Sequence, residues 1–171
     1  MRGIVLPIVT ALSVVGSAAA QGGGPSVTLH VGDDPARRCY RLAMAGTATD
    51  RALQTCDAAI AAQAEAPRRR NLIASFANRG TIHYLAGRYA EAAGDFTRAV
   101  DAGGDTAVVH TNKGLAYEQL GREEPSYDAL ARAAYERALR LNPDYALARA
   151  RLGELGKPRR ERSPLRRRVI A

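Results

Sequence analysis

The sequence predicts an all-α fold in which helical hairpins stack side by side. Asn78-Arg79-Gly80 returns 34 residues later as Asn112-Lys113-Gly114. The repeated positions recur at spacings of four and three, as in Phe76, Gly80 and His83, which places them on one face of a helix. A repeat of this length corresponds to one helix–turn–helix unit, which cannot bury its apolar face alone and therefore packs on its neighbours.

Capping residues predict where the helices begin and end. Asp34 followed by Pro35 is typical of an N-cap and a first helical position, and Gly46 is typical of the residue after a helix. Thr49 and Asp105 are expected to cap later helices. Helices are expected over 35–45, 50–64, 68–86, 89–102 and 106–120, followed by a partner helix that closes at Asn142-Pro143 and a capping helix that stops at Gly156.

The repeated positions resemble the tetratricopeptide repeat, in which a Leu-Gly pair and an aromatic residue on one helix are followed by Ala and an aromatic residue on the next. The resemblance covers about residues 35–156 and implies about three antiparallel hairpins plus a capping helix. It is carried by Phe76, Gly80, Ala92, Phe96 and Ala99 in one unit, and by Gly114, Tyr117, Ala131, Tyr135, Ala138 and Pro143 in the next.

The repeat pattern also assigns packing roles. Gly80, Gly114 and Gly153 are expected to let the partner helix approach closely, because a glycine inside a helix costs about 1 kcal/mol relative to alanine and needs such a reason. Two departures stand out. Arg79 and Lys113 replace the leucine of the pair, and the second unit is five residues longer before Ala131, which predicts a longer loop or an extra helical turn.

Residues 1–20 have the pattern of a secretory signal peptide, with Arg2, an apolar stretch and a cleavage site near Ala20-Gln21. A membrane anchor is the alternative, but the apolar stretch is shorter than the ~20 residues that a spanning helix needs. Residues 21–34 are expected to form a linker with a short strand or extended segment at 26–31. The predicted location is therefore the periplasm or the medium.

Two cysteines, Cys39 and Cys56, occur in the chain. In an exported protein an isolated pair usually closes into a disulfide. Metal binding would need more ligands than two thiols, and a redox pair is usually Cys-x-x-Cys. In exported tetratricopeptide proteins that this chain resembles, such a pair staples a weak first repeat across facing helices, which also favours a structural disulfide.

The resemblance to tetratricopeptide repeats implies a concave groove that binds peptides, and five polar residues are candidates to line it. Asn78 and Asn112 recur at one position, and an amide can bind a backbone as both donor and acceptor. Arg79, Lys113 and Arg151 could add positive charge for a carboxylate. The alternative is that the asparagines make local hydrogen bonds and the basic side chains are solvated.

No catalytic motif, metal-ligand spacing or phosphate-binding loop is present in the sequence, so no catalytic residue, metal or cofactor is expected. His83 and His110 fall on core stripes and are expected to pack there, with metal ligation as the alternative. The sequence predicts a non-enzymatic scaffold or adaptor that binds a protein or peptide in its groove. A third interpretation is a non-catalytic subunit of an envelope enzyme.

Residues 157–171 carry Lys157 and six arginines against Glu161, which is most of the +8 formal charge. Such a block is typical of a disordered, solvated tail. The alternative function is docking of this tail onto anionic lipid or a cell-wall polymer. Nucleic acid is not an expected partner, because the chain is predicted to be exported and no aromatic residues lie between the arginines.

Overall fold

The computed structural model describes residues 34–65 and 69–163, and all regular structure in these ranges is helical. The all-α class is therefore confirmed. The predicted signal peptide, the expected strand at 26–31 and residues 164–171 lie outside the described ranges. The helices are α1 (Pro35–Met44), α2 (Asp50–Glu65), α3 (Arg69–Leu85), α4 (Tyr89–Asp101), α5 (Ala107–Leu120), α6 (Tyr127–Leu141), α7 (Ala146–Leu155) and the short 3₁₀ helix η1 (Arg159–Glu161).

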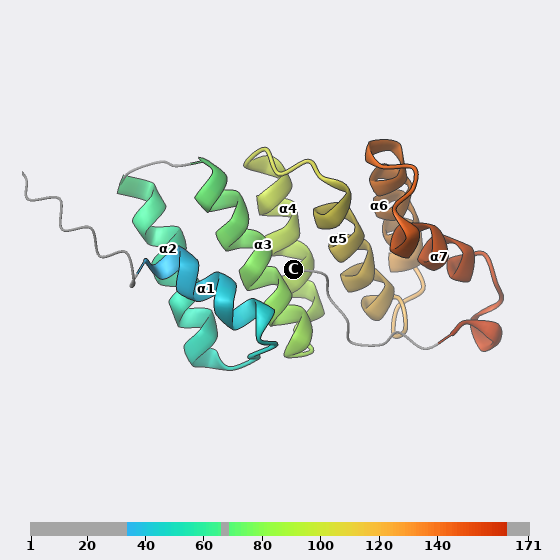
Figure 1. Ribbon diagram of the computed structural model, residues 1–171. Helices are drawn as coiled ribbons and strands as arrows, with labels where there is room; N and C mark the ends of the chain where they lie inside the picture. Colours follow the sequence, from blue (N-terminus) through green and yellow to red (C-terminus); the bar gives the residue numbers. More distant parts are fainter. Residues whose placement is uncertain (1–33, 66–68, 164–171) are drawn as a thin grey trace, which may run out of the picture.

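The helices form a row in which each α-helix packs on the next one along the chain. Figure 1 shows this row running from α1 and α2 at one end to α6 and α7 at the other. α1 also packs on α3 and α3 contacts α5, so alternate helices touch across the hairpins. Contacts between neighbours along the chain are typical of a repeat architecture.

The first helix begins and ends as its capping residues predict. The Asp34 carboxylate accepts a hydrogen bond from the Ala36 N–H at 2.9 Å. At the other end Gly46 has φ +68°, and the Thr47 N–H bonds back to the Leu42 carbonyl at 2.9 Å. This pairing satisfies carbonyl groups that the end of the helix would otherwise leave open.

The cap of α5 differs from the expected one. The Thr106 hydroxyl, and not Asp105, accepts from the Val109 N–H at 3.3 Å. The Asp105 carboxylate bonds instead to His110 and Arg137. A charged arginine and a histidine ring thus outcompete the backbone N–H for this carboxylate.

Two of the three repeated glycines have the predicted packing role. A methyl group on Gly80 would lie 3.0 Å from the Phe96 ring, and one on Gly114 would lie 2.5 Å from the Tyr135 ring. Phe96 and Tyr135 are fully buried. The prediction for Gly153 is wrong, because nothing lies within 4 Å of the place where its methyl group would stand. In the described part of the chain only the short 3₁₀ helix η1 follows α7, and it does not reach Gly153.

The buried apolar residues form two clusters. The larger one runs through α3 to α7 and includes Tyr84, Phe96 and Tyr135. The smaller one joins α1, α2 and Ile82 of α3, and the predicted disulfide between Cys39 and Cys56 lies inside it, fully buried. No helix in the described ranges is long and apolar enough to span a membrane.

Of the two irregular segments near the C-terminal end, the loop takes one of its two predicted forms, and the tail differs from its prediction. The extra residues of the second unit form a longer loop over 121–126, and α6 begins at Tyr127. Residues 157–163, which belong to the predicted disordered tail, contain η1 and contact α6 and α7. Carboxylates on α6 and α7 bind this segment. The prediction of disorder considered only the charges within the tail, and these partners lie elsewhere in the chain.

Candidate functional site

Arg79, a predicted groove residue, is held by carboxylates of the same chain. Its guanidinium makes two hydrogen bonds of 2.7 Å to Asp95 on α4 and a third, of 2.6 Å, to Asp57 on α2. Asp95 is 1% exposed and also pairs with Arg98 at 2.8 Å. The hydrogen bonds to Asp95 raise the pKa of Arg79 above its usual range. Arg79 therefore links α2, α3 and α4, and its positive charge is balanced by carboxylates of its own chain.

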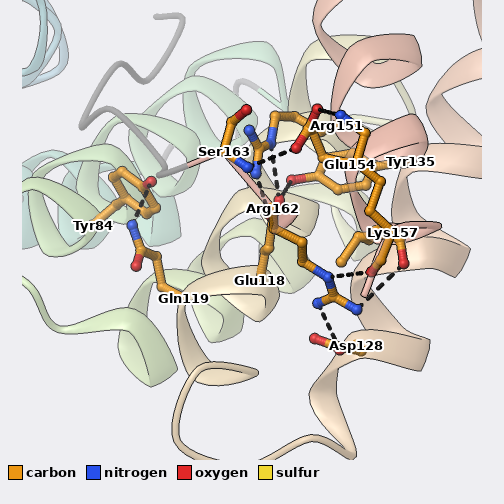
Figure 2. Close-up of polar contacts among 11 residues, drawn as sticks. Tyr84, Glu118, Gln119, Asp128, Tyr135, Arg151, Glu154, Lys157, Arg162 and Ser163 are labelled. Atoms are coloured by element: carbon orange, nitrogen blue, oxygen red, sulfur yellow. Dashed lines mark hydrogen bonds and ion pairs between the residues drawn. The ribbon is translucent and has the colours of Figure 1, made fainter. Parts of the chain in front are cut away.

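Arg151 is also used internally. Its guanidinium pairs with Glu118 on α5, whose carboxylate also accepts from the Tyr135 hydroxyl at 2.8 Å. Burial alone would lower the pKa of Arg151, but the hydrogen bonds to Glu118 raise it overall, while burial and Glu118 raise the pKa of Tyr135. Figure 2 shows these side chains meeting between α5, α6 and α7.

The two predicted groove asparagines are buried. Asn78 is 8% exposed and Asn112 is 3% exposed. Their neighbours on the same helices, Thr81 and Thr111, bond to carbonyl groups one turn back and are also buried. This part of α3 and α5 therefore belongs to the packed interior of the structure.

Lys113 differs from the other two basic candidates. It is half-buried, and its Nζ lies 5.8 Å from the centroid of the Tyr117 ring. An ammonium group over an aromatic face is attracted to the ring. Among the described residues no carboxylate forms an ion pair with the Lys113 ammonium.

Two hollows meet at Tyr117. One, of about 420 Å³, lies between α4 and α6 and is lined by small residues of α4 together with Leu120 and Tyr127. The other, of about 200 Å³, lies between α5 and α6 and is lined by His110, Lys113, Leu130, Arg137 and alanines of α6. The Tyr117 and Tyr127 rings stack with centroids 6.1 Å apart. Together the hollows form a mostly apolar surface with Lys113 at its side, which we call the Tyr117 groove.

A third cavity, of about 460 Å³, lies where the C-terminal segment meets α5 and α6. Its lining includes four arginines, Arg122, Arg159, Arg160 and Arg162, against Glu118 and Asp128. Arg159 and Arg162 both bind Asp128, at 2.9 Å and 2.8 Å. Figure 2 shows Arg162 reaching toward Asp128.

The end of this segment is held by α7. Glu154 accepts from Lys157 and from the Ser163 N–H at 2.7 Å, and these bonds lower its pKa to about 2. Sequence patterns did not indicate that the arginines gather at one cavity, because the loop over 121–126 and residues 159–162 meet only in three dimensions.

The described residues contain no group of histidines, cysteines and acids that could hold a metal ion. His110 bonds to Asp105 at 2.7 Å, and His83 lies with its ring 3.8 Å from Asp95. Asp95 and Glu118, the two acids that pair with Arg79 and Arg151, were not identified from the sequence. Their signal was their place on the helix that faces a basic repeat position.

The described residues form a row of packed helices with a mostly apolar groove and a basic cavity. Comparison with family models, curated proteins and solved structures finds no match to this chain. The resemblance to tetratricopeptide repeats therefore stays a prediction, whereas the helical architecture and the buried disulfide belong to the structure.

Proposed function

We propose that this protein is an exported, non-enzymatic scaffold of tetratricopeptide type that binds a protein or peptide partner. The observation that carries the proposal is the Tyr117 groove, which three successive helices build and whose rim includes Leu130, 47% exposed. Stacked hairpins commonly use such extended surfaces for binding. A buried disulfide is compatible with an oxidising compartment outside the cytoplasm.

The binding surface proposed here is the Tyr117 groove, which differs from the groove expected from the sequence. Arg79 and Arg151 are occupied by Asp95 and Glu118, so they supply no charge to a ligand. The groove predicted from the sequence shared Lys113 with these residues, and Lys113 is the member that also lines the Tyr117 groove.

Site-specific photo-crosslinking in the source cells tests the proposal. A photoreactive residue at Leu130 is expected to capture one partner of defined mass, because Leu130 lines the groove. The same residue at Tyr40, which is 48% exposed on α1 and outside the groove, is the matched control. Equal capture from both positions, or capture from neither, would contradict the proposal.

A second candidate function is docking to an anionic lipid surface, favoured by the four arginines that gather at the C-terminal cavity. Each basic residue near such a surface adds about 1 kcal/mol. Sedimentation with phosphatidylglycerol vesicles is expected to show binding that weakens with salt. Binding that is equal for neutral phosphatidylcholine vesicles, or that survives both deletion of residues 164–171 and Arg160→Gln, would argue against this function.

A further inference from the structure

Arg79 and Lys113 hold the same position in the two repeat units but have different surroundings. Gly80 against Phe96 and Gly114 against Tyr135 fix the register between the units. In this register Lys113 stands where Arg79 stands, and Ala134 of α6 stands where Asp95 stands on α4. One unit therefore has a guanidinium paired with a buried carboxylate, and the other has an ammonium facing a buried alanine.

The second carboxylate on Arg79 is missing from the later unit as well. Arg79 also bonds to Asp57 of α2, and the position that corresponds to Asp57 on α4 is Thr97. The same place in the fold thus carries two acids in the first unit and none in the second.

The surroundings of Lys113 make an unpaired charge costly. Lys113 is a half-buried residue, and it lines the hollow together with Tyr117, Leu130, alanines of α6, His110 and Arg137. A charge in such surroundings loses hydration and is stabilised strongly when a carboxylate is supplied. The two arginines that line the groove each have a carboxylate of this chain beside them, since Arg98 binds Asp95 and Arg137 binds Asp105.

We infer that the Tyr117 groove is a carboxylate-binding site, in which Lys113 pairs with a glutamate or aspartate of a partner segment whose flanking apolar side chains fill the two hollows. This inference rests on the proposed function and names the chemistry of the partner. The hollow beside Lys113 has a volume of about 200 Å³, which suits one side chain and not a folded domain.

Charge decides among the occupants of the groove. Residues 164–171 of this chain contain three arginines and no acid, so they would bring like charge to Lys113. An acidic segment with apolar neighbours supplies both the missing counter-ion and the apolar contacts. A second copy of the chain is a competing occupant, and the experiment below detects it by sedimentation velocity.

Titration of the ¹⁵N-labelled full chain with a blocked peptide tests the inference. The probe is acetyl-Ala-Leu-Glu-Leu-Ala-amide, and the matched control replaces its glutamate by glutamine. We expect chemical-shift changes centred on α5 and α6 for the acidic peptide and about tenfold weaker binding for the control, the usual scale of a charge-assisted hydrogen bond. Equal affinity for the two peptides, or shifts centred elsewhere, would overturn the inference.

Two variants act on the protein side. Lys113→Met removes the cation, and Ala134→Asp supplies the internal carboxylate that the first unit has in Asp95. Both are expected to abolish the preference for the acidic peptide, and Ala134→Asp is expected to melt at a higher temperature than Ala134→Asn. Lys157→Met, which removes an ammonium paired with Glu154 outside the groove, is the control that keeps the preference.

The outcomes separate this inference from the proposed function. Capture at Leu130 together with equal affinity for the two peptides retains the binding scaffold and rejects the carboxylate site. An acidic peptide that binds through Lys113 without any capture at Leu130 in cells retains the site and rejects the scaffold. Self-association in sedimentation velocity that Lys113→Met abolishes makes a second copy the occupant and overturns the partner assignment.

Discussion

His83 shows how a single side chain can link the fold to pH. It lies on α3, is 15% exposed, and its Nδ1 is buried without a hydrogen-bond partner among the described residues. Burial lowers its pKa, and Arg79 and Arg88 act in the same direction, whereas Asp95 and Glu91 oppose them. The folded protein therefore binds a proton at His83 less readily than the unfolded chain does.

The sign of the pH dependence follows from this difference. Histidine in the unfolded chain titrates near pH 6.5, at about its reference value. Below that pH the unfolded chain takes up a proton at His83 more readily than the folded state does, so the free energy of unfolding decreases as the pH falls. We expect the urea midpoint to be lower at pH 5.5 than at pH 7.5. His83→Gln should reduce the drop, and an equal drop in the variant would contradict the assignment.

At the scale of the helices, Gly114 and Gly153 are expected to respond oppositely to substitution by alanine. Ala at 114 would press a methyl group against the Tyr135 ring, and such overpacking costs about 1–3 kcal/mol. Ala at 153 meets open space and gains helix propensity of up to about 1 kcal/mol. Urea denaturation should therefore rank Gly153→Ala above the wild type and Gly114→Ala below it. A Gly114→Ala protein as stable as Gly153→Ala would show that Tyr135 does not fix the spacing of α5 and α6.

The sequence predicts the helices well and the site poorly, for one physical reason. Helix ends depend on local chemistry, so Asp34 and Gly46 mark α1 as expected. Ion pairs depend on which helices meet, and Arg79 finds Asp95 sixteen residues away on the next helix. The open space beside Gly153 likewise depends on which elements pack on α7, and the sequence around Gly153 does not determine this.

At the scale of the whole molecule the apolar core is divided. The cluster that holds the disulfide joins α1 and α2 to Ile82, and the larger cluster spans α3 to α7. In a repeat protein each unit is stabilised by its immediate neighbours, so the two ends can unfold with different free energies. The disulfide therefore stabilises one end of the row more than the other.

Removal of the disulfide tests this division. Cys39 and Cys56 close a loop of 17 residues, so Cys39→Ser with Cys56→Ser is expected to lose about 3 kcal/mol of local stability. Hydrogen exchange followed by mass spectrometry should show faster exchange in α1 and α2, with exchange in α5 and α6 unchanged. The oxidised wild type with and without a reducing agent is the matched comparison. If exchange accelerates equally along all the helices, the row unfolds as one cooperative unit and the division of the core has no energetic consequence.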